Sequence, residues 1–336
     1  MLQTDRLGHA EVKPSAPDNP PMHLMIPFAA PLSEAGRQAR GSLSLPQLPQ
    51  LRRLLAQLDV VDQTAGDEWS FTPPHEAALA RELGWSGADG LLPWAARQAA
   101  ADGLDVAGQA WGLVTPAHWH VGTDQVSLID PQLLALDEAG SRAFFGAVKD
   151  LFTGDGYTLH WTAPLRWYAA HDSLATLRTA SLDRVVGRNV DAWLGTDPAA
   201  RRLRRLQSEV QMVLYSDALN DERIARGLLP LNSFWLSGCG LAQKVTVTGP
   251  EPTVDTRLRS PALNEDWAGW LKAWDTLDEG PVADAAARAE KGDPVRLTLC
   301  GERGSVTWQS VPRGFWRGLR ARLTALPDLH AVLEPL

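Results

Sequence analysis

The chain has 336 residues, of which 44% are hydrophobic and 21% charged, and its formal net charge is -8. A chain of this length can bury a sizeable core and lies near the upper size of a single domain. Its basic residues are mostly dispersed, which excludes nucleic acid as an expected partner because nucleic-acid binding needs a basic face. Two cysteines are too few for a disulfide framework, and no apolar window reaches the roughly 18 residues of a membrane span. We therefore expect a cytoplasmic protein without a membrane partner, and the excess of arginine over lysine fits a bacterial coding bias.

The first 21 residues are rich in proline and contain no apolar run, which predicts a disordered tail over 1–21. The rest, 22–336, is expected to form a single globular domain. A weak connection near residues 190–200 suggests two packed lobes, 22–192 and 193–336, as an alternative.

Helices and strands are expected to alternate along the chain. Helical spacing of apolar residues, together with caps and stops, predicts helices over 45–58, 73–84, 93–104, 137–152, 263–277 and 315–326, and one that starts at Asp197 and Pro198. Alternating or short apolar runs predict strands over 22–28, 108–121, 125–129, 158–162, 166–170, 245–247, 295–299 and 305–308. The mixture predicts an α/β fold with a central mixed sheet flanked by helices.

Two histidines, His118 and His120, are the candidate metal ligands. Strand alternation places both imidazoles on one face and Trp119 on the other. Such a pair can chelate a transition metal, but spacing supplies no third ligand. A divalent metal is therefore possible but not expected, and a hydrogen-bonded structural pair is the main alternative.

Cys239 lies between two glycines after an apolar strand, as a nucleophile on a tight turn would. A nucleophilic cysteine needs a base or a helix N-terminus, and no histidine occurs between His171 and His330. A small buried residue is the favoured interpretation. No complete dinucleotide or phosphate-loop motif is present, so no nucleotide cofactor is expected.

The chain is rich in tryptophan, with 14 residues of this type. Trp267, Trp270 and Trp274 recur at helical intervals and predict a core stripe. Trp69 and Trp119 fit no such stripe, and either could border a pocket.

A run over 208–240 reads as a helix, a polar turn, a buried strand and a glycine turn. Polar residues stand where the chain changes direction, and they are the candidate ligand-binding residues for a small anionic or phosphorylated metabolite: Gln211, Asn220, Arg223 and Asn232, followed by Ser237 and Cys239. The alternative is a self-satisfied turn in which Asn220 caps a helix, Arg223 pairs with Glu209 and Asn232 closes a loop.

The spacing of Asn220, Arg223, Gly227 and Asn232 resembles a segment of the archaeal-type cofactor-independent phosphoglycerate mutases, with Ser237 where that family has arginine. A broader likeness, which includes 118–120 and 166–168, is to bacterial proteins of the regulatory protein RpfE type, often labelled mutase-like. The resemblance implies an alkaline-phosphatase-like sheet, possibly degenerate, and a serine nucleophile with two divalent metals.

That inventory is incomplete here. The resemblance implies metal ligands that include an Asp-Gly pair directly after the first strand, but the segment after the first predicted strand, 29–33, contains no aspartate. We therefore expect a mutase relative that has lost two-metal phosphoryl transfer and binds a small anion or acts in regulation. One alternative is an active mutase-like isomerase, phosphotransferase or other metal-dependent enzyme that uses His118 and His120. A regulatory or scaffolding protein is another.

Overall fold

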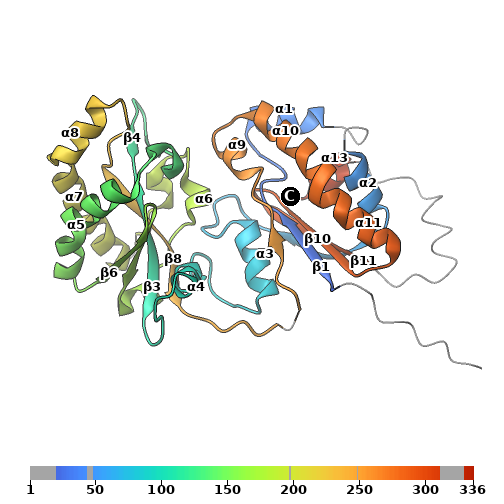
Figure 1. Ribbon diagram of the computed structural model, residues 1–336, viewed down its shortest axis with the longest axis horizontal. Helices are drawn as coiled ribbons and strands as arrows, with labels where there is room; N and C mark the ends of the chain where they lie inside the picture. Colours follow the sequence, from blue (N-terminus) through green and yellow to red (C-terminus); the bar gives the residue numbers. More distant parts are fainter. Residues whose placement is uncertain (1–19, 44–47, 197, 248, 311–328) are drawn as a thin grey trace, which may run out of the picture.

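The computed structural model describes residues 20–43, 48–196, 198–247, 249–310 and 329–336. Nearly all of the predicted tail and the predicted helix over 315–326 lie outside these residues. The described chain forms two sheets, each in its own lobe (Figure 1).

The first lobe is built on a five-stranded mixed sheet. Its strands, in spatial order, are β2 (Leu58–Ala65), β11 (Gly304–Ser310), β10 (Val295–Cys300), β1 (Met22–Ile26) and β9 (Thr253–Val254). Strands β1, β9 and β10 are parallel, while β11 is antiparallel to both of its neighbours. The mixed sheet that the sequence predicts is thus present.

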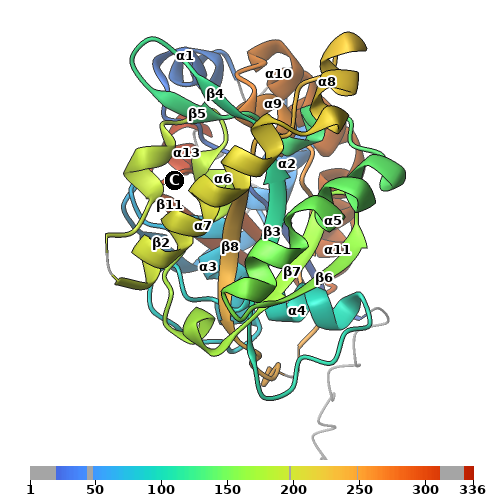
Figure 2. The same cartoon turned by 90° about the vertical axis from the view of Figure 1, so that its left-hand side faces the viewer.

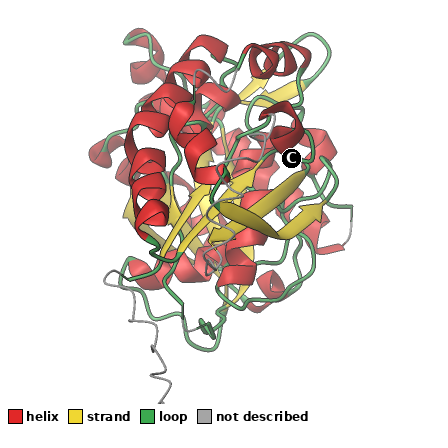
Figure 3. Ribbon diagram, turned by 90° about the vertical axis from the view of Figure 1, so that its right-hand side faces the viewer, coloured by secondary structure: helices red, strands yellow, loops and turns green. Residues whose placement is uncertain are grey.

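Helices cover both faces of this sheet (Figure 3). Leu24 and Ile26 of β1 belong to the core beneath one helical layer, and Met25 packs against Ala78 and Cys300 on the opposite face. This is the alternation of a strand buried on both sides. The layers consist of α1 (Glu34–Ser42), α2 (Pro49–Leu55), α10 (Trp267–Leu277), α11 (Ala283–Lys291) and α13 (Leu329–Leu333) on the first face and α3 (Pro74–Glu82) on the second.

The second lobe is built on a four-stranded antiparallel sheet, in the order β6 (Thr158–Ala163), β7 (Arg166–Ala170), β3 (Ala110–Ala117) and β8 (Ser233–Leu241). Helices α5 (Glu138–Gly154) and α7 (Pro198–Tyr215) lie over one face (Figure 2). Helix α4 (Trp94–Ala101) packs on the other face against Trp111 and Tyr168. A small hairpin of β4 (Trp119–Val121) and β5 (Val126–Leu128), with the short helices α6 (Leu182–Val185) and α8 (Ala218–Ala225), completes this lobe.

Strand pairing does not follow the suggested boundary between residues 192 and 193. Strand β1 pairs with β10, and β3 pairs with β8, so both pairings join the two suggested lobes. The first lobe thus contains both ends of the described chain and the second its middle, and the chain crosses between them after α3 and after β8. Because backbone hydrogen bonds join strands that are remote in sequence, a local change in composition does not reveal such a division.

Several local predictions need correction. Residues 245–247 form no strand, and the expected polar turn at Asn220 is instead helix α8. Asp217 caps this helix by accepting a hydrogen bond from the amide of Leu219 at 2.9 Å. Helices α1 and α11 and the edge strand β2 were not predicted, because the helices are rich in small or polar residues and β2 buries little surface. Among the described residues, no helix combines the length and apolarity that crossing a membrane requires.

Candidate functional site

The predicted ligand residue Asn220 lies buried between the end of α7 and the approach to β8. Its side-chain amide donates to the carbonyls of Leu214 and Leu231 at 2.8 and 2.7 Å and accepts from the amide of Leu231 at 2.8 Å. These three bonds tie the helix to the segment that leads into the strand.

Arg223 is 8% exposed and points into the second lobe. Its guanidinium donates to the carbonyl of Leu229 at 2.9 Å and to that of Leu134, and burial lowers its pKa. It does not pair with Glu209, whose carboxylate lies 3.7 Å from Arg205 instead. Backbone carbonyls thus occupy much of its donor capacity.

Asn232 joins the mutase-like segment to the hairpin of the second lobe. It accepts from the amide of Trp119 at 2.7 Å and donates to the carbonyl of the same residue at 2.9 Å. Gln211 donates to Ser233 at 3.4 Å, and with Asn232 it lines a hollow of about 350 Å³ beside Trp119. A ligand role for these residues stays a prediction, and this hollow is where such a ligand would bind.

The two remaining candidate ligand residues, Ser237 and Cys239, lie within β8. Ser237 is 6% exposed and Cys239 is fully buried. Burial raises the pKa of the Cys239 thiol to about 12. A neutral buried thiol at neutral pH is a poor nucleophile.

His118 and His120 lie close together, with ring centroids 6.4 Å apart. Nδ1 of His118 contacts the carbonyl oxygen of Pro230 at 2.8 Å, which occupies one of its two nitrogens. Within the part of the chain that the structure describes, no group of three or more His, Cys, Asp or Glu residues is placed to hold a metal ion.

Another cavity lies between the two lobes and has a volume of about 550 Å³. It opens at the carboxyl ends of β1 and β10, which lead into the segments 28–33 and 301–302. Ligands of α/β sheets bind at such ends of parallel strands. We call this cavity the interlobe cleft. The first lobe supplies lining residues from 28–33, 68–75, 262–267 and 301–302, and the second lobe supplies Asp183, Arg184, Val186, Gly187 and Arg188.

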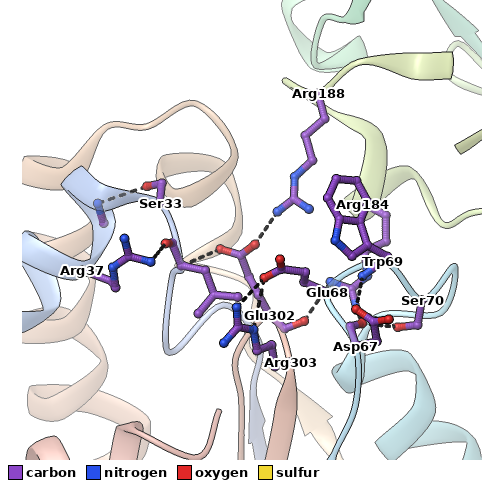
Figure 4. A network of polar contacts seen from close by, with 12 residues as sticks. Ser33, Arg37, Asp67, Glu68, Trp69, Ser70, Arg184, Arg188, Glu302 and Arg303 are labelled. Carbon is purple, nitrogen blue, oxygen red and sulfur yellow. Dashed lines mark hydrogen bonds and ion pairs between the residues drawn. The ribbon is translucent and has the colours of Figure 1, made fainter. Parts of the chain in front are cut away.

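Glu302 connects the lobes at the floor of this cleft (Figure 4). Its carboxylate accepts from the amide of Leu32 at 2.8 Å and pairs with Arg188 of the second lobe. Its backbone carbonyl accepts from Arg184, also of the second lobe, at 2.8 Å. On the same wall Glu68 pairs with Arg303 at 2.8 Å.

Arg184 is 2% exposed and has an unusual set of acceptors. Besides the carbonyl of Glu302, it donates to the carbonyl of Asp67 at 3.3 Å and to the hydroxyl of Ser70 at 3.0 Å. Its Nε is buried without a hydrogen-bond partner. Burial, followed by repulsion from Arg188, lowers its pKa to about 10, so the group remains charged at neutral pH.

A second charged group of the cleft is centred on Asp183. Its carboxylate lies 3.2 Å from Nε2 of His75 and 2.6 Å from the guanidinium of Arg259. Burial alone would raise the pKa of Asp183, but these two contacts outweigh it and hold the pKa near 2. Next to His75 in sequence, Glu76 accepts a hydrogen bond from Ser181, and burial raises its pKa to about 7. A carboxylate that contacts a histidine can orient it as a general base.

The backbone of the cleft is strained at two places. Phe28 and Glu265, with φ of 60° and 54°, are two of the three non-glycine residues with positive φ in the described chain. The carbonyl of Phe28 accepts from Trp270 Nε1 at 3.0 Å, which helps to hold this conformation. Strain of this kind persists where surrounding contacts fix it and is concentrated at ligand sites.

Sequence reasoning missed this site. Its residues come from five separated segments, and their local patterns are ordinary turns and helix starts. Trp69, which fits no core stripe, was the one sequence signal that pointed here, and the structure places it on the cleft wall.

Comparison with known proteins yields no family for this chain. No protein-family model matches it, and no curated protein resembles it in sequence. Among solved structures, a cofactor-independent phosphoglycerate mutase from Thermoplasma acidophilum DSM 1728 shares 13% identity over 86% of this chain and 90% of its own, with a TM-score of 0.33. The PH0037 protein from Pyrococcus horikoshii shares 12% identity over 87% and 88%, with a TM-score of 0.41. Both scores are low, and neither likeness bears on the argument that follows.

Proposed function

We propose that this chain binds a small anionic ligand, a carboxylate or a phosphate ester, in the interlobe cleft. Arg184 and Arg188 would supply the positive charge, since guanidinium groups bind both kinds of oxyanion. The cleft is of the size that small-molecule sites occupy in other proteins.

The set of contacts around Arg184 is the observation that carries this proposal. Three carboxylates of the cleft each contact an arginine: Glu302 with Arg188, Glu68 with Arg303, and Asp183 with Arg259. In contrast, Arg184 forms no ion pair among the described residues, and its acceptors are two carbonyls and a hydroxyl. A buried cation without a carboxylate partner is costly, and a bound anion would lower that cost.

The direct test is a titration of the purified protein with inorganic phosphate and with 3-phosphoglycerate, followed by calorimetry and by the melting temperature. Arg188→Gln, which keeps polarity but removes the accessible charge, should weaken binding at least tenfold if it loses a charge-assisted contact of about 1.5–3 kcal/mol.

Arg53→Gln is the matched control, because Arg53 on α2 also bonds a glutamate, Glu290, and lies outside the cleft. It should bind like the parent. An unresponsive parent protein, or equal affinity in Arg188→Gln, would contradict the proposal.

A second candidate function is acid–base catalysis on the bound anion, and the contact between His75 and Asp183 favours it. Asp183 occupies Nε2 and leaves Nδ1 to accept a proton from a ligand. Prolonged incubation with phosphorylated three-carbon acids, followed by phosphorus NMR, would test it by detecting products other than the phosphoglycerate isomers that a mutase interconverts. Conversion by the parent and by Arg53→Gln, lost in His75→Gln with binding retained, is the expected result; a parent that binds but converts nothing would contradict it.

A further inference from the structure

Trp69 is an exposed tryptophan that lines the interlobe cleft. The residue is 60% exposed, yet its ring stacks on that of Trp193, which is buried, with centroids 5.8 Å apart and planes inclined by 26°. A single exposed apolar side chain needs no explanation. The side chain of Trp69, however, is also held in place by the ring of Trp193.

The turn that carries Trp69 is fixed by contacts from both lobes. Its own amide donates to the carboxylate of Asp67 at 3.0 Å, and Ser70 Oγ donates to the carbonyl of Asp67 at 2.7 Å. From the second lobe, Arg184 donates to that same carbonyl and to Ser70 (Figure 4). The exposed ring is therefore preorganised, which lowers the entropy lost when a ligand packs on it.

A positively charged side chain lies beside the ring on which Trp69 stacks. The guanidinium carbon of Arg188 is 5.9 Å from the centroid of Trp193, the ring on which Trp69 stacks. Trp69 and Arg188 also line the same cavity. One ligand can therefore place an anionic group at Arg188 and a flat ring on Trp69.

We propose that Trp69 is a stacking surface for the ligand of the interlobe cleft, and that this ligand is a small anion that carries a planar aromatic ring. The inference rests on the proposed anion binding and deepens it by naming the ligand class. Aromatic side chains recognise flat rings through their faces, without requiring a particular pattern of hydrogen bonds.

The test compares phenyl phosphate with ethyl phosphate, which share the same charged group and differ in the ring. The parent protein should bind phenyl phosphate about tenfold more tightly, as one stacked ring supplies. Trp69→Ala should reduce this ratio to near one while its affinity for ethyl phosphate stays close to that of the parent. Trp69→Leu retains apolar bulk without an aromatic face and should lose most of the ratio as well.

Trp161→Leu is the control, because Trp161 is a partly buried tryptophan of β6 that does not line the cleft. It should retain the preference for phenyl phosphate. A parent that binds both phosphates equally, or a preference that survives in Trp69→Ala, would overturn the stacking surface and leave anion binding intact. A parent that binds neither phosphate would overturn both proposals.

Discussion

Arg223 and Arg184 are both buried arginines, but their surroundings differ. Arg223 lies within one lobe and closes the segment before β8 onto the carbonyl of Leu134. Arg184 reaches across the lobes, and its Nε has no hydrogen-bond partner. A donor satisfied by backbone within one lobe is expected to act on stability, whereas a charged group at a cavity without a direct ion pair is expected to act on binding.

Arg223→Ala should lower the free energy of unfolding by about 1–3 kcal/mol, because it leaves buried carbonyls unpaired. It should leave the response to 3-phosphoglycerate unchanged. Chemical denaturation of the parent, Arg223→Ala and the exposed neighbour Arg226→Ala would measure this, with little effect expected for the neighbour. A variant of unchanged stability that no longer responds to the ligand would return the ligand site to the mutase-like segment.

Glu76 should make stability depend on pH. Its pKa in the folded chain is raised from 4.5 to about 7, chiefly by burial. A carboxyl group that binds its proton more tightly when folded adds stability in full below its unfolded pKa and loses it as the pH rises through its folded pKa. Stability contributed by Glu76 should therefore decline between pH 4.5 and about 7.

Glu76→Gln imitates the protonated group and should show a smaller decline over that range when melting temperatures are measured. Glu138→Gln is the control, because Glu138 is an exposed carboxylate on the outside of α5. Identical pH profiles for the parent and Glu76→Gln would show that Glu76 is ionised normally.

At the scale of elements, α10 connects the core of the first lobe to the interlobe cleft. Its tryptophans follow the spacing that the sequence predicts, and Trp270 and Trp274 are fully buried. Trp270 also donates to the carbonyl of Phe28, the strained residue in the cleft wall. The helix thus both fills the core and supports the segment after β1.

Trp270→Ala should cost about 3–5 kcal/mol of unfolding free energy, which is typical of removing a buried tryptophan. Trp267→Ala, at a partly buried position one turn earlier, should cost clearly less. Urea unfolding of both variants would measure the difference. Equal, small effects would mean that the stripe does not form the core of this lobe.

Trp270 also links the stability of this lobe to ligand binding. Trp270→Phe keeps most of the side-chain volume but removes the hydrogen bond to the carbonyl of Phe28. We expect this variant to weaken ligand binding clearly while it lowers the free energy of unfolding only a little.

At the scale of the whole molecule, the chain should lack phosphoglycerate mutase activity. Two-metal phosphoryl transfer needs a set of carboxylate and histidine ligands, and the segment 28–33 at the end of β1 contains no aspartate. A coupled assay with and without added manganese should give no turnover above background. Robust activity that chelator abolishes would show that other residues supply the metal ligands.

Local patterns determined much of the secondary structure. The helix over Pro74–Glu82, the strands β7, β10 and β11, and the Asp137 cap of α5 all follow from spacing, caps and alternation within a few neighbouring residues. Polar residues at changes of chain direction also marked Asn220 and Asn232 as candidate ligand residues, with a self-satisfied turn as the alternative. Their hydrogen bonds to backbone atoms of distant or adjacent segments were beyond what local spacing can specify.

The sequence by itself determined the composition class, most elements and the core stripe of α10, because these depend on contacts between residues that are close along the chain. Only the tertiary structure decided which strands are neighbours and which side chains meet in the interlobe cleft. His75 and Asp183, or Arg188 and Glu302, are more than a hundred residues apart. They come together because β1 pairs with β10 and Arg184 of α6 donates to the carbonyl of Glu302 after β10. Long-range pairing of this kind leaves no periodic signal in one sequence, since each partner retains an ordinary local pattern.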